Sequence, residues 1–245
     1  MNPQGNTILI TGASNGIGQA LAREFHSAGN KVIAAARNLA ALGDLAEELP
    51  GLAIARLDVT DDTGIAAFAS KMAAEHPDLN VLVNNAGIMR FETGIDVAAA
   101  EETITTNLLG PIRLTAALLP QLLGTKNPAI VNVSSSLAFV PPPFSPSYGA
   151  SKAGLHAWTV ALRFQLAGKA EVIEIIPPAV QTELTPGQSQ SAQAMPLEDY
   201  IAETLALLRT DPTPIEIVVE RAQGCRLAVD DEVVIAELRK MGIPA

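Results

Sequence analysis

Short apolar segments alternate along this chain with longer stretches that are rich in Ala and Leu and have helical spacing. This alternation predicts βαβ units around a parallel sheet, because helical connections cover both faces of such a sheet. The apolar segments are continuous, which is typical of strands buried on both sides. We therefore predict an α/β fold, a doubly wound parallel sheet that forms a single domain over residues 1–245.

The same pattern places seven strands and seven helices. The predicted strands are Asn6–Thr11, Lys31–Ala35, Ala53–Leu57, Val81–Val83, Ala129–Val133, Glu171–Ile176 and Ile215–Val219. The predicted helices are Gly16–Ala28, Leu39–Leu49, Thr63–Glu75, Val97–Leu123, Ser147–Leu166, Leu197–Leu208 and Asp230–Lys240. Pro-rich stretches follow the fifth and sixth strands, and open α/β sheets bind ligands at the carboxyl ends of their strands. These stretches are therefore predicted to be loops at the mouth of a site.

Composition narrows the class of partner. With 48% hydrophobic and 17% charged residues among 245, the chain can form its own core. Its formal net charge of −10 gives nothing to attract a nucleic-acid backbone, so we predict a small-molecule partner and no nucleic acid. No segment approaches the roughly 20 apolar residues that span a bilayer, and residues 1–6 lack the features of a secretory signal. We predict a cytoplasmic protein with no membrane partner.

Metal and disulfide chemistry is not expected. Cys225 is the only cysteine, so the chain can form no intramolecular disulfide and no cysteine-based zinc site. His26, His76 and His156 lie in three separate helical stretches, and we interpret each as a surface or packing residue. No metal site is therefore predicted.

A glycine-rich turn, Thr11–Gly18, follows the first predicted strand and opens the first helix. Strand, turn and helix in this order predict a Rossmann-type fold with a phosphate site at a helix N-terminus. Gly12 permits the tight turn, Gly16 lets the backbone approach a pyrophosphate, and Gly18 lets the helix pack on the sheet. The alternative is a glycine-rich turn that binds no ligand.

The end of the second strand indicates which nucleotide is bound. Ala36 and Arg37 stand where an NAD-binding unit usually places an acidic residue on the ribose hydroxyls. A guanidinium matches phosphate geometry, so we predict the adenosine 2′-phosphate of NADP(H) in preference to NAD(H), with a further hydrogen bond from Ser14 or Asn15. In the alternative, Arg37 is a solvated surface residue.

Two further strand ends carry candidate cofactor ligands. Asp58, before Val59 at the end of the third strand, either accepts a hydrogen bond from the adenine amino group or caps the following helix. Asn84–Gly87 ends the fourth strand, where small and amide-bearing residues can approach the cofactor ribose. By itself this second motif indicates only a turn.

Tyr148 and Lys152 are four residues apart and therefore share a face of one predicted helix. A fixed cation near a phenol favours the tyrosinate and lowers the pKa of the tyrosine from its ordinary value of about 10. Ser135, just after the fifth strand, is placed to hold the same substrate oxygen with which Tyr148 exchanges a proton. The alternative is a packing tyrosine with a solvated lysine, because this spacing alone is a weak signal.

These motifs, taken in order, resemble those of the short-chain dehydrogenase/reductase family over residues 5–182. The series is Thr11–Gly18, Asn84–Gly87, Asn107, Ser135, Tyr148 and Lys152. The resemblance implies a nicotinamide cofactor, which carries the hydride chemistry, with Tyr148 as proton donor or acceptor and Ser135 as ligand of the substrate oxygen. It also implies that Lys152 binds the nicotinamide ribose and that Asn107 holds a water linking Lys152 to solvent. Residues 1–135 would then form mainly the cofactor-binding half and residues 136–245 the catalytic half.

The chain departs from the family after the sixth strand. The family usually has Pro-Gly before a Val-x-Thr that lines the nicotinamide carboxamide, whereas Pro178 replaces the glycine here. Proline fixes φ and removes a donor, so this loop is predicted to take a different path, with Val180 and Thr182 still placed to bind the amide. The last strand runs on to Cys225 and a charged helix instead of the family's Gly-Gly pair. A homodimer or homotetramer is expected, but the family's contacts are not carried over to this edge of the sheet.

Together these features predict an NADP(H)-dependent oxidoreductase that interconverts a carbonyl and a secondary alcohol. The residues predicted to contact the cofactor are Gly12, Ser14, Asn15, Gly16, Ile17, Gly18, Arg37, Asp58, Val59, Asn85, Ala86, Gly87, Tyr148, Lys152, Val180 and Thr182. Two other functions remain as alternative interpretations of the sequence. One is a redox sensor that binds NADP(H) without turnover, and the other is a nucleotide-sugar epimerase or dehydratase, which the length of 245 residues disfavours.

The substrate is predicted to be small, neutral and moderately apolar, because apolar residues are expected around it. These residues are Met89, Leu137, Phe139, Pro142, Phe144, Leu184 and Met195. Arg90, the one basic residue near them, is expected to point to solvent. The Pro186–Pro196 loop is predicted to be mobile without ligand and to order over the substrate as a lid.

Overall fold

The computed structural model describes residues 1–228, 230–240 and 242. The strands are β1 (Thr7–Thr11), β2 (Lys31–Ala36), β3 (Ala53–Arg56), β4 (Val81–Asn84), β5 (Ala129–Val133), β6 (Glu171–Ile175) and β7 (Glu216–Ile217). The α-helices are α1 (Gly16–Ser27), α2 (Leu39–Glu48), α3 (Asp62–Glu75), α4 (Val97–Ile104), α5 (Gly110–Leu123), α6 (Pro146–Gln165), α7 (Leu197–Leu208), α8 (Glu220–Arg226) and α9 (Asp231–Lys240). All seven predicted strands are present, with ends shifted by at most two residues.

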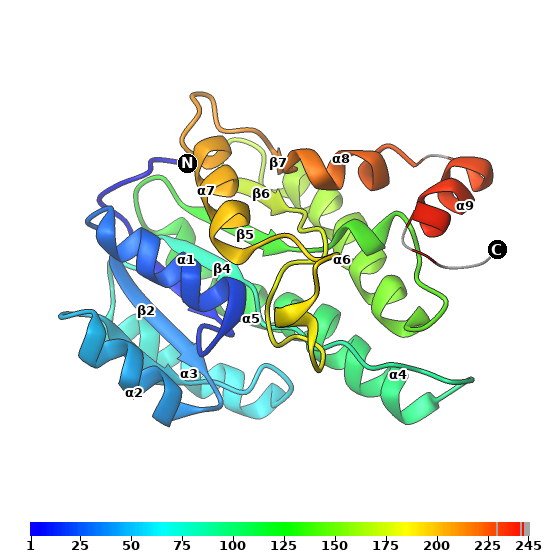
Figure 1. Cartoon of the computed structure of the whole chain (residues 1–245). Coiled ribbons are helices and arrows are strands. Elements are labelled where there is room, and N and C mark those ends of the chain that lie inside the picture. Colours follow the sequence, from blue (N-terminus) through cyan, green and yellow to red (C-terminus); the bar gives the residue numbers. More distant parts are fainter. Residues whose placement is uncertain (229, 241, 243–245) are drawn as a thin grey trace.

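The described strands form one parallel sheet in the order β3-β2-β1-β4-β5-β6-β7. Helices α1, α2 and α7 cover one face, and α3, α5 and α6 cover the other, which gives three layers (Figure 1). Adjacent residues such as Ile8 and Leu9 face opposite layers and are both fully buried, which explains the continuous apolar runs. The predicted doubly wound α/β fold is confirmed. The strand order reverses between β1 and β4, where open sheets of this kind bind their ligands.

The long helix predicted over Val97–Leu123 is wrong, because the structure interrupts it. Helix α4 ends at Ile104, a π-helical turn covers Thr105–Leu109, and α5 begins at Gly110. Pro111 lacks the amide that a regular α-helix would donate to the carbonyl of Asn107. Single π-helical turns of this kind are frequent at functional sites.

Helix α8 is also absent from the predicted helices. It has only seven residues, and Gly224 interrupts its short apolar face of Ala222 and Cys225. A segment so short shows no helical period that sequence reasoning could detect.

The described residues contain no helix long and apolar enough to cross a membrane.

A row of polar side chains crosses the sheet beneath α5 and α6. Asn84, Asn132, Glu174 and Glu216 are register partners on β4, β5, β6 and β7, so they share one face of the sheet. Asn84 donates to Asn132 at 2.8 Å, and Asn132 donates to Thr159 of α6 at 2.9 Å. We call these four residues the polar row. It interrupts an otherwise apolar layer, and sequence reasoning did not anticipate it.

Candidate active site

The loops at the carboxyl ends of the first six strands enclose a cavity of about 380 Å³. Every residue predicted to contact the cofactor lines this cavity, and so does Ser135. The exception within the predicted catalytic set is Asn107, which lies beneath the lining and is fully buried. The structure therefore brings together, at one edge of the sheet, residues that are up to 170 positions apart in the sequence.

The glycine loop is shaped by close backbone contacts. Gly12 has a φ of +67°, and a Cβ at this position would lie 2.8 Å from the Cα of Ala86. A Cβ at Gly18 would lie 2.3 Å from the Asn85 side chain, so only glycine lets α1 approach β4 this closely. The side chain of Asn15 does not cap α1. The first amides of this helix are consequently available to an anion such as a pyrophosphate.

Arg37 and Asp58 mark the end of the cavity beyond β2 and β3. Arg37 is exposed and lines the cavity. Burial acts to raise the pKa of Asp58, but hydrogen bonds from Thr60 and the nearby Arg37 charge lower it overall. Asp58 does not cap α3, because Asp61 accepts the amide of Gly64 at 2.9 Å and is the capping residue. The capping alternative for Asp58 is therefore wrong.

The loop after β4 is tied to β1. Asn85 donates through its side chain to the Thr11 carbonyl at 2.8 Å and to the Gly12 carbonyl at 3.3 Å. The Thr11 hydroxyl accepts the backbone amides of Asn85 and Ala86, both at 3.0 Å. The Asn85 side chain is thus engaged in joining the two loops, which leaves the backbone of Ala86 and Gly87 to line the cavity.

Ser135, Tyr148 and Lys152 come together on the other side of β4. Ser135 follows β5 and precedes a short 3₁₀ turn, Ser136–Ala138, whereas Tyr148 and Lys152 project from α6. Tyr148 is 6% exposed and Lys152 is 4% exposed, so both are shielded from solvent. Lys152 Nζ donates to the Val133 carbonyl at 2.9 Å and lies 5.8 Å from the centroid of the Tyr148 ring.

Burial dominates the electrostatics of this pair. It raises the pKa of Tyr148 to about 12, and the Ser135 hydroxyl acts in the opposite direction. It lowers the pKa of Lys152 to about 8, and the Glu174 carboxylate acts in the opposite direction. The expected net lowering of the Tyr148 pKa is not met in this structure, because burial outweighs the effect of the neighbouring groups. At neutral pH both side chains are accordingly protonated.

Asn107 connects the π-helical turn to two neighbours. Its side chain accepts the amide of Ile88 and donates to the carbonyl of Ile88, both at 2.8 Å, and also donates to Ser151 of α6 at 3.0 Å. It makes no hydrogen bond to Lys152 among the described residues. A Cβ at Gly87 would lie 3.3 Å from the Asn107 side chain and 3.5 Å from Lys152 Nζ, so both groups border this glycine.

Comparison with known proteins shows the family. The family model described as short chain dehydrogenase matches residues 6–193. The chain is a short-chain dehydrogenase. It is 37% identical over 235 residues to the oxidoreductase DltE of Bacillus subtilis (strain 168), with 92% of each chain covered. This dehydrogenase is therefore an NAD(P)-dependent oxidoreductase.

Two solved structures have the same fold. A short-chain dehydrogenase from Burkholderia cenocepacia J2315 in complex with NADP has a TM-score of 0.83 and 27% identity, with 97% of this chain and 99% of that chain covered. A short-chain dehydrogenase from Sphingobium yanoikuyae in complex with NADPH has a TM-score of 0.79 and 26% identity, with 97% of this chain and 94% of that chain covered.

The loop after β6 of this dehydrogenase is held by its own downstream segment. Val180 pairs with Met195 in a parallel bridge, and the Gln188 side chain donates to the Val180 carbonyl at 2.7 Å. Gln188 also lies 3.5 Å from the hydroxyl of Thr182, and it accepts the hydroxyl of Thr185 at 2.9 Å. A carboxamide thus already contacts the oxygens of Val180 and Thr182, the two residues predicted to bind the nicotinamide amide.

The predicted substrate pocket is only partly observed. Met89 and Leu184 line the cavity, whereas Leu137, Phe139, Pro142, Phe144 and Met195 do not. Phe139 instead packs edge-on against His156 with ring centroids 4.7 Å apart, beneath the guanidinium of Arg226. The 3₁₀ turn after Ser135 directs this side chain away from the cavity. Arg90 lines the cavity but forms a two-bonded ion pair with Glu102, at 2.8 and 3.0 Å.

Proposed function

We propose that this enzyme is an NADP(H)-dependent oxidoreductase that interconverts a carbonyl and a secondary alcohol on a small, neutral, moderately apolar substrate. The observation that carries the proposal is the convergence of Ser135, Tyr148 and Lys152 at the wall of the cavity that the glycine loop also lines. A phenol that can donate a proton, a hydroxyl ligand and a cation beside one cleft provide the groups that carbonyl reduction requires.

In the direction of reduction, Tyr148 donates its proton to the carbonyl oxygen. Burial raises the pKa of Tyr148 to about 12, so the phenol holds this proton at neutral pH. Ser135 hydrogen-bonds the same oxygen and aligns it with the phenol. When bound, the nicotinamide supplies the hydride to the carbonyl carbon. The protonated Lys152 stabilises the tyrosinate left behind, and proton transfer to Tyr148 from solvent completes the cycle.

The residues at the adenosine end support NADP(H) over NAD(H). Arg37 lines the cavity where β2 ends, and no acidic residue follows that strand directly. A guanidinium there would form charge-assisted hydrogen bonds with a 2′-phosphate. Two structural relatives are complexes with NADP or NADPH, which agrees with this preference.

The walls near Ser135 support a neutral, apolar substrate. Met89, Pro178 and Leu184 contribute apolar surface to the cavity. The guanidinium of Arg90 is held by Glu102, so its charge is compensated and does not favour an acidic substrate. A phosphorylated or acidic compound at this wall would therefore lose its hydration without gaining an uncompensated guanidinium from Arg90.

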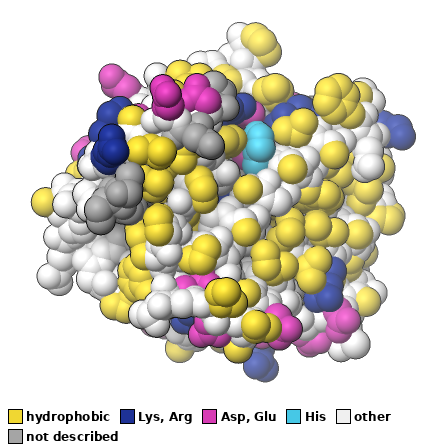
Figure 2. All heavy atoms as spheres, turned by 90° about the vertical axis from the view of Figure 1, so that its right-hand side faces the viewer, with side chains coloured by type: hydrophobic (Ala, Val, Ile, Leu, Met, Phe, Trp, Pro, Cys, Tyr) yellow, Lys and Arg dark blue, Asp and Glu magenta, His cyan; other side chains and the backbone are white. Residues whose placement is uncertain are grey.

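Self-association and cytoplasmic location stay predictions. The side of the molecule that carries α4, α6, α8 and α9 shows many hydrophobic side chains among its charged residues (Figure 2). Phe91 and Val97, near the start of α4, are 60% and 63% exposed. An exposed apolar surface of this kind supports a homodimer or homotetramer.

A panel of neutral aldehydes, ketones and secondary alcohols, followed by the absorbance of NADPH, tests the proposed function. We expect turnover with apolar carbonyl compounds and a higher kcat/KM with NADPH than with NADH. A phosphorylated or acidic carbonyl compound as the best substrate would contradict the substrate class. Tight NADPH binding without turnover of any compound would instead favour the redox sensor.

A further inference from the structure

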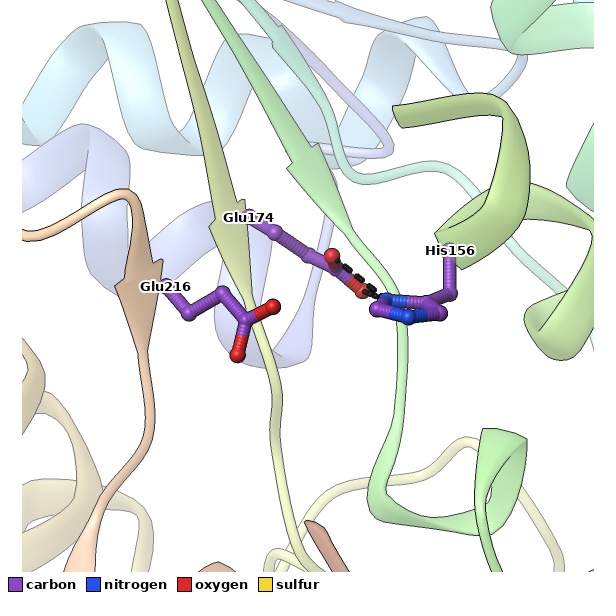
Figure 3. Close-up of side chains that lie close together, drawn as sticks. All are labelled: His156, Glu174 and Glu216. Carbon is purple, nitrogen blue, oxygen red and sulfur yellow. Dashed lines mark hydrogen bonds and ion pairs between the residues drawn. The ribbon is translucent and has the colours of Figure 1, made fainter. Parts of the chain in front are cut away.

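A carboxylate lies buried in the sheet directly behind α6. Glu174 of β6 belongs to the polar row, and its side chain is fully buried. Both of its carboxylate oxygens face Nδ1 of His156, at 2.9 and 3.1 Å (Figure 3). His156 follows Lys152 by one turn of α6, so these two side chains lie on the same face of the helix. The histidine thus joins the buried carboxylate to the helix that carries Tyr148 and Lys152.

Glu174 is also placed close to Lys152 through the sheet. Its register partner on β5 is Asn132, and the next residue, Val133, accepts the hydrogen bond of Lys152 Nζ at 2.9 Å. The negative charge of Glu174 acts on Lys152, where it raises the pKa against the larger lowering caused by burial. The two charges therefore interact inside the protein, although no hydrogen bond joins them.

The catalytic lysine needs such a counter-charge. Its only hydrogen-bond partner among the described residues is a neutral carbonyl, and burying an ammonium favours its deprotonated form. A buried carboxylate is equally unfavourable alone, but two opposite buried charges offset part of each other's desolvation. A nearby anion would thus keep the lysine protonated at the pH of catalysis.

We propose that Glu174, held in place by His156, is a positioning residue that keeps Lys152 charged during catalysis. The inference rests on the proposed function, because it assigns to Glu174 an effect that operates through Lys152 and Tyr148. His156 fixes the carboxylate by donating Nδ1–H to it.

In the described part of the chain, the charged groups nearest to Glu174 apart from His156 and Lys152 already have hydrogen-bond or ion-pair partners. Glu216 of β7 forms a two-bonded ion pair with Arg226 of α8, at 2.8 and 3.0 Å. Arg163 of α6 donates to the carbonyls of Val172 and Ile215. Ligand atoms of His156, Glu174 and Glu216 lie within 4.8 Å of one another, as in a metal site. The positive charge of Arg226, which is paired with Glu216, would repel a metal cation bound between these three side chains. This repulsion favours a positioning role for Glu174 over a metal site.

Glu174→Gln tests the proposal, because it removes the charge and keeps the shape. In the direction of reduction, activity of the wild type should fall as pH rises past about 8, where Lys152 loses its proton. In the variant this alkaline limb of kcat should move to lower pH by about one unit, because the lysine has lost a neighbouring anion. Glu171→Gln is the matched control, since it removes the same charge from an exposed position on the same strand. Its alkaline limb should coincide with that of the wild type.

Two substitutions of His156 separate its effect on charge from its effect on packing. His156→Leu removes the donor that fixes the Glu174 carboxylate, so the carboxylate is no longer held in place and the limb should move as in Glu174→Gln. His156→Asn retains a donor at the position of Nδ1 and should restore the wild-type limb. A merely structural role would lower kcat in all three variants without moving the limb.

A second readout observes the lysine without cofactor or turnover. Lysines labelled with ¹³C at Cε give one NMR resonance each, and the resonance lost in Lys152→Met identifies Lys152 among six. Its titration midpoint should drop in Glu174→Gln by the same amount as the kinetic limb. Unchanged midpoints and limbs, with Tyr148→Phe inactive, would overturn the role of Glu174 and leave the proposed function intact. An active Tyr148→Phe would overturn both the role of Glu174 and the proposed function. If added Zn²⁺ moved the alkaline limb of the wild type but not that of the His156 variants, the three side chains would form a metal site instead.

Discussion

Replacing Lys152 by methionine is expected to stabilise the cofactor-free protein at neutral pH while it destroys the catalytic site. Methionine has a similar length and no charge. Burial lowers the pKa of Lys152 from its ordinary value of 10.5 to about 8. At about 1.4 kcal/mol per pH unit, this difference corresponds to about 3 kcal/mol by which the protonated lysine destabilises the folded state. Loss of the hydrogen bond to Val133 subtracts roughly 1 kcal/mol from the gain at every pH.

Proton binding sets the direction of the pH dependence. Between about pH 8 and pH 10.5 the unfolded chain binds more protons at this residue than the folded chain does. The wild type therefore gains stability as pH rises through this window and loses it as pH falls through about 8. The variant has no such dependence. The free energy of unfolding by which the variant exceeds the wild type at pH 7 should therefore decrease by about 3 kcal/mol as the pH approaches 10.5.

Urea unfolding of both proteins at several pH values from 7 to 10 measures this directly. The difference between their free energies of unfolding cancels the titration of all other groups and isolates Lys152. We expect a variant more stable at pH 7 by roughly 2 kcal/mol, with an advantage that decreases steadily above pH 8. A difference that stays constant over this range would show that burial does not perturb Lys152.

Three further predictions concern the cofactor and the loop over it. Arg37→Ala should erode the preference for NADPH over NADH, which we expect to be at least about tenfold in the wild type; equal kcat/KM for the two cofactors in the wild type would contradict this. Gln188→Ala should tighten NADPH binding by about fivefold in a fluorescence titration, because the Gln188 carboxamide contacts the oxygens of Val180 and Thr182 that are predicted to bind the nicotinamide amide. Weaker binding would show that Gln188 does not compete with the nicotinamide for these oxygens. Hydrogen exchange of residues 186–196 should be fast without ligand and slow with cofactor and substrate together; equal rates would exclude a lid.

The features that could be predicted from the sequence are those that depend on residues close together along the chain. The apolar runs identify the strands, because each strand of this sheet is buried on both faces. The turn at Thr11–Gly18 and the Tyr148/Lys152 spacing occur within single βα or helical units, so local order is enough to place them. The cavity then assembles because parallel strands bring their carboxyl ends to one edge.

The features that the sequence missed depend on register between distant strands or on the path of a short turn. Glu174 meets His156 only because β6 pairs with β5 in one register and α6 covers both strands. Phe139 was expected in the pocket, but the 3₁₀ turn before it sends the ring to Arg226. The interruption at Asn107 follows from Pro111 and from the contact of Gly110 with Val59, where a Cβ would lie 2.9 Å from a carbonyl oxygen.

The proposed reaction depends on proton transfer by the Tyr148 hydroxyl. The sharpest measurement is kcat of Tyr148→Phe with the best carbonyl substrate and NADPH, beside NADPH affinity from fluorescence titration. Tyr200→Phe is the matched control, because Tyr200 is the other tyrosine of the chain and lies buried in α7. We predict that Tyr148→Phe lowers kcat by about 10²–10⁴-fold and leaves NADPH affinity within a few fold, while Tyr200→Phe keeps near wild-type turnover. A Tyr148→Phe enzyme that retains more than about a tenth of wild-type kcat would contradict the assignment.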